Sequence, residues 1–310
     1  MSTADGPLVI GADLGGTKCH SVLADAAGTV VHEDRRRTAE RADPADVLVD
    51  GLTAMLAFAR ERGSAVGAAV IGVPGFVDPS SHLVVGANNL GWTEFDLRAR
   101  LDPLLAVPYA VENDVNLAAL GEARSGAGRG AASFVTVSLG TGLGGAVVVD
   151  GQVLRGAHDA AGEFGFLLAG RHQLRRPGLL GMESLVGGPA LAARARELAA
   201  ADGASGPGWD DAAVVFAAAR DGNRIAVRVV GELLEHVAVT VVDVCAVLDP
   251  ERVVLDGSVG RALEPWLADL AELVRPSLLY SPDLRISTLA PNAALAGAVG
   301  EAARLLGVAG

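Results

Sequence analysis

The sequence predicts an α/β protein of two domains with a cleft between them. The chain has 310 residues, more than a single hydrophobic core usually organises. Half of the residues are apolar and 20% are charged, which is typical of globular proteins and excludes a disordered chain. The third observation decides the fold class: the same succession of strand, glycine-rich loop and strand opens each half of the chain.

The first half begins with a meander of three strands. An apolar run that starts at Leu8 ends at Asp13, and a glycine loop follows as far as Lys18. A strand pattern then resumes, and a turn at residues 26–28 leads into a third strand, so we expect these strands to be antiparallel. The periodicity further predicts a helix at 44–62, a buried strand from Ala68, a strand at 108–111 and a helix at 115–124.

The second half repeats this opening. Residues 133–138 have a strand pattern, a glycine loop occupies 139–145, and 146–149 form a second strand. Asp150 and Gly151 then predict a hairpin turn before a short third strand. Two halves that open alike indicate a duplicated architecture. The remaining expected elements are an amphipathic helix at 224–248, a buried strand at 252–255 and a third glycine loop at 256–260.

The first two glycine loops allow three nucleotide-binding interpretations. The stretch from Gly11 to Lys18 is close to a P-loop, but its Thr and Lys are in reverse order and a strand follows instead of a helix. The stretch from Gly140 to Gly145 has the spacing of a dinucleotide fingerprint, yet a strand and a hairpin turn follow it. The favoured interpretation is that both loops are hairpin tips whose backbone N–H groups wrap the phosphates of ATP.

The ATP interpretation gives a role to side chains in and beside these loops. Glycine lets the backbone approach a phosphate closely, and Thr17 and Thr141 add hydroxyl donors. Asp13 ends the first strand, where we expect it to hold a hydrated Mg²⁺, which takes few carboxylates and keeps several waters. Either loop alone is also consistent with an ordinary tight hairpin, so the interpretation depends on both.

Phosphoryl transfer to an alcohol also needs a carboxylate that receives the hydroxyl proton. Asp114 follows a buried strand at the junction between the two halves, where a cleft is expected, and is the candidate base. Its neighbour Asn113 can donate and accept hydrogen bonds to adjacent sugar hydroxyls. In isolation, an Asn-Asp pair at a strand end is more often a helix cap.

Composition excludes several partners and compartments. The 37 acidic and 25 basic residues give a net charge of −12, which disfavours nucleic acid and membrane surfaces as partners. No basic, apolar leader is visible at the N-terminus, so a cytoplasmic protein is expected. Cys19 and Cys245 lack a Cys-x-x-Cys spacing and are expected to be small core residues. Of the basic residues 24 are Arg and one is Lys, and Lys18 directly follows the first glycine loop, where its ammonium can approach phosphate.

Several motifs, in this order, resemble those of the ROK family of bacterial sugar kinases, repressors and related proteins, glucokinases especially. The resemblance extends from about residue 8 to residue 305. It implies the actin-like, hexokinase-type ATPase fold, two domains that close on a sugar and ATP, and usually a homodimer or tetramer. The motifs are Asp13-Leu-Gly-Gly-Thr-Lys18, Gly72-Val-Pro-Gly75, Glu112-Asn-Asp-Val-Asn116, Leu139-Gly-Thr-Gly-Leu-Gly-Gly145, Ala161-Gly-Glu-Phe-Gly165 and the loop at Gly257.

The resemblance also implies roles for single residues. Asp114 corresponds to the catalytic base of the family, and Asp13 is expected to hold Mg²⁺ through water. The residues expected to bind the sugar are Gly75, Asn89, Asn113, Glu163, Phe166 and Glu183. The residues expected to bind ATP, besides Asp13, are Gly15, Gly16, Thr17, Lys18, Gly140, Thr141, Gly142, Gly144, Gly257 and Ser258.

The chain departs from the family pattern at its zinc site. Most zinc-containing members have a His where this chain has Phe166, and a cysteine cluster where residues 175–182 have none. Without imidazole and thiolate ligands a tetrahedral zinc site cannot form, so we expect no zinc. The exchange also removes a polar contact to the sugar, which favours a hexose other than plain glucose. Glucosamine or kanosamine is a candidate because Glu163 and Glu183 could pair with an ammonium.

The resemblance therefore predicts an ATP-dependent hexose kinase that phosphorylates the 6-hydroxyl of glucose or of a glucose-like amino sugar. The expected domains are 1–114, joined by a C-terminal helix at about 294–310, and 115–293. One alternative is a sugar-responsive transcriptional regulator, but only 12 residues precede Asp13 and no basic recognition helix is visible. The other is a sugar-binding protein without catalysis, which the intact Asp13 and Asp114 motifs disfavour.

Overall fold

The chain divides into two compact units, each of which is described by itself. The computed structural model describes residues 6–175, 181–203 and 208–307. The first unit comprises residues 1–129, 151–160 and 291–310, and the second comprises 130–150 and 161–290.

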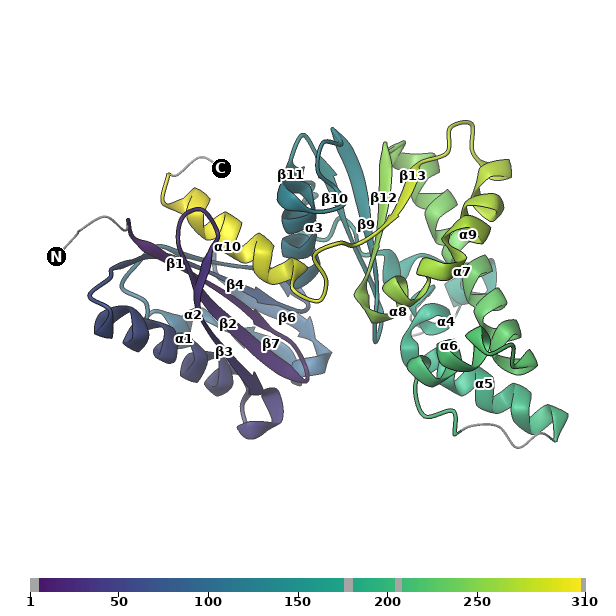
Figure 1. The fold of residues 1–310 in the computed structure, drawn as a ribbon, viewed down its shortest axis with the longest axis horizontal. Helices are drawn as coiled ribbons and strands as arrows, with labels where there is room; N and C mark the ends of the chain where they lie inside the picture. The colour runs from purple at the N-terminus through teal and green to yellow at the C-terminus, as the bar shows by residue number, and fades with distance from the viewer. Residues whose placement is uncertain (1–5, 176–180, 204–207, 308–310) are drawn as a thin grey trace. The chain divides into compact units, whose positions relative to one another are not determined.

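The first unit is built on a five-stranded sheet with the strand order β3-β2-β1-β4-β8 (Figure 1). Strand β1 is antiparallel to β2, and β2 is antiparallel to β3, so the predicted meander is confirmed. On its other side β1 is parallel to β4, which is parallel to β8. The strands are β1 (Leu8–Leu14), β2 (Lys18–Ala24), β3 (Val30–Arg37), β4 (Val66–Val73) and β8 (Tyr109–Asn113).

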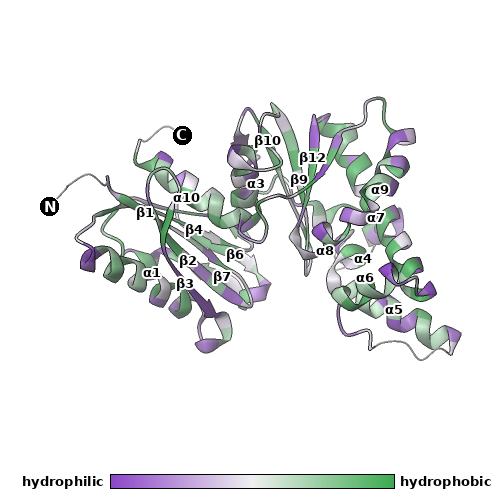
Figure 2. Ribbon diagram, viewed as in Figure 1, coloured by the Kyte–Doolittle hydropathy of each residue, from purple (hydrophilic) through white to green (hydrophobic). Residues whose placement is uncertain are grey.

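Helices cover both faces of this sheet. Helix α1 (Pro44–Glu61) packs on the face that carries Ile10 and Leu14, while α3 (Asp114–Ser125) and α10 (Ala293–Leu305) pack on the other face. In Figure 1 α1 and α10 accordingly lie on opposite sides of the strands. Figure 2 shows the contrast between the apolar strands β1 and β4 and the hydrophilic edge strand β3. A charged edge strand of this kind opposes pairing with another chain.

Local sequence explains where α1 and α3 begin. Asp43 accepts a hydrogen bond from the Ala45 amide, and Pro44 occupies the first helical position, where its missing N–H is not needed. Asn113 caps α3 in the same way. Helix α3 then crosses α10 closely, because Gly121 and Gly297 have no side chains where the two backbones meet. Helix α3 is therefore held by a cap at its N-terminus and by close packing on α10 along its middle.

A second, smaller sheet in the first unit was not predicted. It has the strand order β5-β6-β7 and leads into the short helix α2 (Arg98–Leu101). A 3-10 turn at Asn88–Leu90 joins its last two strands and carries Asn89. The strands are β5 (Phe76–Val77), β6 (Leu83–Ala87) and β7 (Trp92–Asp96).

The other five-stranded sheet has the strand order β11-β10-β9-β12-β13, which repeats the order of the first sheet, and all of its strands except the edge strand β11 belong to the second unit. Strand β9 is antiparallel to β10 and parallel to β12. The predicted repetition of a meander followed by parallel strands is thus confirmed. The strands are β9 (Ser133–Leu139), β10 (Leu143–Val149), β11 (Gln152–Val153), β12 (Arg252–Asp256) and β13 (Asp283–Ile286).

Five helices of the second unit build its core, which includes Phe216, Leu233 and Val241. The longest, α7, has the predicted bounds, because Asn223 caps its first turn and Asp249 adopts a left-handed conformation at its end. The five helices are α5 (Gly188–Asp202), α6 (Ala212–Arg220), α7 (Arg224–Leu248), α8 (Gly257–Ala262) and α9 (Leu267–Val274). The short helix α4 (Glu183–Val186) precedes them in the chain.

Two predicted loops were partly wrong. The loop expected at 139–145 is only the turn 140–142, because Gly144 and Gly145 pair with β9 as part of β10. The loop expected at 256–260 is the start of α8, since the chain turns at Gly257, with a φ of 78°, directly into a helix. Glycine is permitted in all of these conformations, so its presence alone does not distinguish them.

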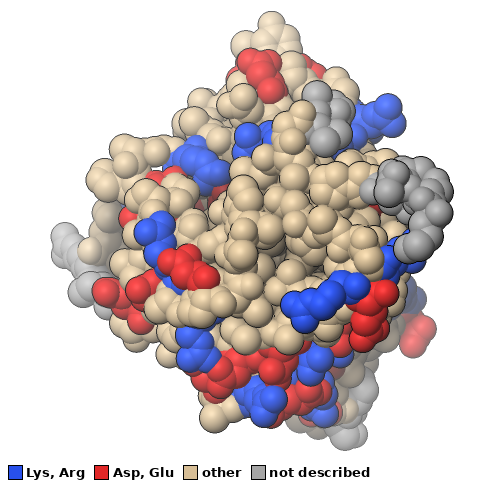
Figure 3. Space-filling model, turned by 90° about the vertical axis from the view of Figure 1, so that its left-hand side faces the viewer, with Lys and Arg blue, Asp and Glu red and all other residues tan. Residues whose placement is uncertain are grey.

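The first unit extends beyond the boundary expected after residue 114. Helix α3 belongs to it by contacts, because this helix packs along α10. Cys19 and Cys245 are buried, as expected of core residues. In Figure 3 basic and acidic side chains alternate along the lower part of the displayed face, and uncharged residues fill its centre. No helix among the described residues combines the length and apolarity needed to cross a bilayer.

Candidate active site

The carboxyl ends of the parallel strands β1, β4 and β8 bring the acidic residues of the first unit together. Asp13 pairs in register with Gly72, which in turn pairs with Glu112. Residues in register across a sheet have side chains on the same face. Asp114 starts α3 directly after β8 and lies close enough to Asp13 to affect its ionisation. Ligands of open α/β sheets bind at such strand ends.

Asp13 has the electrostatic environment of a cation ligand. Burial and the negative charge of Asp114 raise the pKa of Asp13 to about 7, and the charge of Lys18 opposes the shift. None of the described residues donates a hydrogen bond to the Asp13 carboxylate. A hard cation could therefore compensate the charge of the Asp13 carboxylate without competing with hydrogen-bond donors. These features fit Mg²⁺, which prefers carboxylate and water oxygens.

The turn at Gly15–Thr17 between β1 and β2, called the phosphate turn after its expected ligand, is fixed from both sides. The Gly15 amide donates to the Lys18 carbonyl at 2.9 Å, and the hydroxyl of Thr38 donates to the Gly15 carbonyl at 2.6 Å. A side chain at Gly16 would place its Cβ 2.8 Å from the Asn89 carbonyl oxygen, so only glycine permits this contact. The structure thus brings Asn89, expected to bind the sugar, against the phosphate turn.

Asn113 is both a helix cap and a residue of the site. Its Oδ1 accepts from the amides of Val115 and Asn116, at 2.9 and 3.1 Å. Its Nδ2 donates to the Gly75 carbonyl at 3.0 Å, which joins two residues expected to bind the sugar. The Asp114 carboxylate accepts from the Val115 amide at 2.9 Å. Asn113 can therefore cap α3 and still belong to the expected sugar-binding site.

Three residues beside this pair were not predicted as site residues. The buried Glu112 carboxylate accepts through Oε1 from the Asn113 amide and from Asn116 Nδ2, both at 2.9 Å. Its Oε2 accepts from Nη2 of Arg155. Glu112 and Asn116 were noted only as parts of a motif. Arg155 was missed altogether, because no local pattern marks an isolated arginine as the partner of a residue far away in the sequence.

In the second unit the turn 140–142 is tied to two helices. The Leu143 amide donates to Glu183 Oε2 at 3.0 Å, and the Gly188 amide donates to the Gly140 carbonyl at 2.8 Å. Glu183, expected to bind the sugar, is the first residue of α4 and so also positions this turn. The arrangement leaves Thr141 exposed at the tip of the turn.

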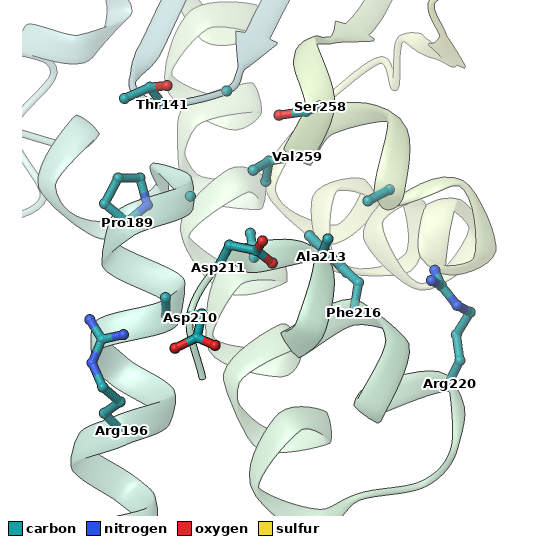
Figure 4. A pocket seen from close by; sticks show the side chains of 15 residues that line it. Thr141, Pro189, Arg196, Asp210, Asp211, Ala213, Phe216, Arg220, Ser258 and Val259 are labelled. Atoms are coloured by element: carbon teal, nitrogen blue, oxygen red, sulfur yellow. The ribbon is translucent and has the colours of Figure 1, made fainter. Parts of the chain in front are cut away.

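A cavity of about 530 Å³ lies next to this turn. Gly140, Thr141 and Ser258, all expected to contact ATP, line it. Figure 4 shows Thr141 and Ser258 at one end of the cavity, with Asp210 and Arg196 towards the other. Its volume is in the range of small-molecule sites. Sequence reasoning missed the lining residues from α5, α6 and the segment between them, which carry no recognisable motif: Pro189, Arg196, Asp210, Asp211, Phe216 and Arg220.

The segment that contains Glu163 carries two phenylalanines, one buried and one exposed. Glu163 precedes a 3-10 turn, Phe164–Phe166, in which the Phe166 amide donates to the Glu163 carbonyl at 3.2 Å. Phe164 is buried in the core, whereas Phe166 is 60% exposed. An exposed phenyl ring thus occupies the position at which the family resemblance led us to expect a histidine in zinc-containing members.

The zinc prediction concerns a segment that is described only in part. Residues 176–180, inside the stretch where a cysteine cluster was looked for, lie outside the described residues. Within the described parts of the chain, no three His, Cys, Asp or Glu side chains gather as a metal site. The prediction that the protein holds no zinc therefore stays a prediction.

Comparison with known proteins places this geometry in a family. The ROK family model matches residues 9–306. A glucokinase from Halalkalibacterium halodurans is 28% identical over 307 residues, covering 93% of this chain and 92% of the relative. A ROK hexokinase structure from Thermus thermophilus has a TM-score of 0.80 at 29% identity, covering 97% of this chain and all of that one.

A third similar protein was solved with ligands. It is a ROK glucokinase from Streptomyces griseus in complex with glucose and AMPPNP, with a TM-score of 0.78 at 29% identity, covering 96% of this chain and 99% of that one. The likeness confirms the expected actin-like ATPase fold. With a family model that matches nearly the whole chain and two repeated sheets that carry its motifs, the protein belongs to the ROK family.

Proposed function

We propose that the protein is an ATP-dependent hexose kinase that transfers the γ-phosphoryl group to the 6-hydroxyl of glucose or of a glucose-like amino sugar. One observation carries the proposal: Asp13 lies at the end of β1, Asp114 directly follows β8 of the same sheet, and burial together with the charge of Asp114 raises the pKa of Asp13. One carboxylate suits a metal ion and the other suits a hydroxyl proton, the pair that phosphoryl transfer to an alcohol requires.

Each residue then has a defined task. The 6-hydroxyl oxygen attacks the γ-phosphorus, its proton passes to the Asp114 carboxylate, and the bond to the β-phosphate oxygen breaks to release ADP. Bound at Asp13, Mg²⁺ would neutralise phosphate charge. The amides of the phosphate turn and of the turn 140–142 would contribute donors, as would the side chains of Thr17, Lys18 and Thr141.

The cavity beside Thr141 is the proposed nucleotide site. Gly140, Thr141 and Ser258 line it together, although Ser258 is far from the other two in the sequence. The AMPPNP bound to the glucokinase from Streptomyces griseus supports ATP as the donor. Placing the adenosine in this cavity leaves the phosphates near the turn 140–142.

Replacing Ala213 with Phe should test this placement. Ala213 lies at the cavity wall on α6 (Figure 4), so a phenyl ring there would fill space that the nucleotide needs. We expect the KM for ATP to rise about tenfold or more, the equivalent of roughly 1.4 kcal/mol in binding, with the KM for sugar unchanged.

Ala217→Phe is the matched control, because Ala217 is an exposed residue of the same helix that does not line the cavity. Steady-state kinetics with ATP varied at saturating sugar would separate the two variants. Equal KM values for ATP in both would place the nucleotide elsewhere.

The acceptor is proposed to be glucose, glucosamine or kanosamine. Glu163 and Glu183 are carboxylates that can accept from hydroxyls or pair with an ammonium, and the exposed Phe166 stands where the family resemblance implies a polar side chain. A coupled assay of ADP release with glucose, mannose, N-acetylmannosamine, glucosamine and kanosamine would decide. Failure of every hexose to stimulate ADP release would refute the proposed function.

Phe166→His should shift the preference towards glucose. The imidazole would restore one hydrogen bond to a neutral sugar, which is worth about 0.5 to 1.5 kcal/mol and so about three- to tenfold in kcat/KM. The measurement is kcat/KM for glucose against glucosamine in both proteins. The control substitution Leu168→His changes another exposed apolar residue of the same segment and should leave the ratio of the two kcat/KM values unchanged.

We also propose that the enzyme is cytoplasmic and that it is a homodimer, one of the assemblies that the resemblance implies. The requirement for ATP supports the compartment. Light scattering after size-exclusion chromatography would measure the mass, and a mass near 31 kDa would contradict the dimer.

A further inference from the structure

Glu112 is a buried carboxylate beside the proposed catalytic base. Its side chain is 9% exposed, and its two oxygens together accept three hydrogen bonds. A buried carboxylate is costly unless a cation and hydrogen bonds compensate its charge. Among the described residues, the cation that contacts Glu112 is Arg155.

Arg155 reaches Glu112 from the segment that follows β11. Its Nη2 donates to Oε2, and its Nη1 lies 3.9 Å from Asp159. Burial alone would lower the pKa of Arg155, but the hydrogen bond and the charge of Glu112 outweigh it and raise the pKa. The guanidinium therefore stays charged and fixes the direction of one carboxylate oxygen.

The other oxygen of Glu112 acts on the residues that flank Asp114. Oε1 accepts from the backbone amide of Asn113 and from the side chain of Asn116, one residue before and two after the base. Asn113 in turn caps α3 and donates to the Gly75 carbonyl. The first turn of α3, which carries Asp114, is thus connected through a single carboxylate to Arg155.

We propose that Arg155 is a positioning residue for Asp114: by holding Glu112, it fixes the strand end and the first helical turn between which the base lies. This inference rests on the proposed function, because it assigns Arg155 to the geometry of phosphoryl transfer. A displacement of about 1 Å in such a geometry can reduce the rate about a hundredfold.

A double-mutant cycle tests the proposal with the variants Arg155→Met, Glu112→Gln and the two combined. Arg155→Met leaves Glu112 as an uncompensated buried charge. Glu112→Gln turns an amide donor either towards Arg155 or towards Asn113 and Asn116. We expect each single variant to lower kcat about ten- to a hundredfold, with the KM for ATP unchanged.

The combined variant should recover much of this loss. With methionine at 155, the amide group of glutamine at 112 can point away from α3 while its oxygen still accepts from Asn113 and Asn116. We therefore expect kcat at least about tenfold above that of Glu112→Gln. Together with a ten- to hundredfold loss in Arg155→Met, this is a coupling of at least about a hundredfold, or about 2.7 kcal/mol. A combined loss equal to the product of the single losses would overturn the proposal.

A second ion pair provides the matched control. Arg194 has the same 41% side-chain exposure as Arg155 and pairs with Glu232 at 2.7 Å, between α5 and α7. Arg194→Met and Glu232→Gln should lower the melting temperature by amounts similar to the site variants and leave kcat of the folded enzyme unchanged. If kcat falls equally in both pairs, Arg155 has only a structural role.

Hydrogen exchange separates this proposal from the proposed function. In Arg155→Met, the amides of residues 113–117 should exchange at least about tenfold faster, while those of the α7 interior keep their rates. This measurement does not depend on turnover. A wild-type protein that phosphorylates no hexose would refute the proposed function alone, whereas unchanged exchange at 113–117 would refute the positioning role.

Discussion

Asp114→Asn is expected to lower kcat by about two to four orders of magnitude, the usual loss when a positioned general base is removed. Asparagine has nearly the same shape and can still accept from the Val115 amide, so the start of α3 should remain intact. The amide cannot take the hydroxyl proton. Single-turnover measurements with saturating ATP and sugar would detect the loss, and thermal unfolding would show that the variant is folded.

Asp202→Asn is a suitable control for this prediction. Asp202 ends α5 and forms an exposed ion pair with Arg224, which is worth little to stability. Full activity in this variant together with a large loss in Asp114→Asn would assign the loss to the site. If Asp114→Asn retains full activity, another group is the base.

Asp13→Asn is expected to lower kcat about a thousandfold at ordinary Mg²⁺ concentrations, because organising the metal contributes several kcal/mol to the transition state. A neutral amide is a weaker ligand for a hard cation than a carboxylate. The apparent Mg²⁺ concentration for half-maximal rate should rise as well, which distinguishes this variant from Asp114→Asn. An unchanged Mg²⁺ requirement would remove Asp13 from the metal site.

The pKa of Asp13 gives this prediction a second readout, in the absence of metal. Because folding raises the pKa from its ordinary value of 3.8 to about 7, the folded protein binds more protons than the unfolded chain between these values. The free energy of unfolding should therefore decrease as pH rises from about 4 to 7. Asp13→Asn should flatten this slope, as measured by denaturant unfolding in EDTA. An identical slope in both proteins would contradict the shift.

Structural elements and motifs that depend on a short, contiguous stretch of sequence could be predicted. The two meanders follow from apolar runs interrupted by glycine, and α7 follows from its helical periodicity and from Asn223. The phosphate turn and the Asn113 and Asp114 pair could be recognised for the same reason, since their motifs are contiguous. The repetition of the sheet order required only that both halves open in the same way.

Features that depend on distant partners could not be predicted. The small sheet β5-β6-β7 consists of short strands whose pairing is decided by the fold around them. The cavity is lined from α5, α6 and α8, whose residues are ordinary in their local context. Arg155 and Glu112 are separated by more than forty residues, so their ion pair became visible only when the chain was folded.

Glycine accounts for the local errors. Gly144 continues a strand and Gly257 begins a helix, although both stand in glycine-rich stretches that were expected to be loops. Because glycine has no side chain, it permits many backbone conformations and does not by itself determine whether a loop, a strand or a helix forms. The neighbouring residues decide, and they do so through contacts with other strands and helices.

The single lysine at the edge of the phosphate turn has a consequence for the chemistry of the whole surface. Lys18 is exposed at the start of β2, and every other basic side chain that carries a permanent charge is an arginine. Amine-selective reagents, acetyl donors and coupling resins can therefore react with only one side chain of this protein. Acylation would remove the positive charge that lowers the pKa of Asp13, so a label attached in this way reports on the surroundings of that carboxylate.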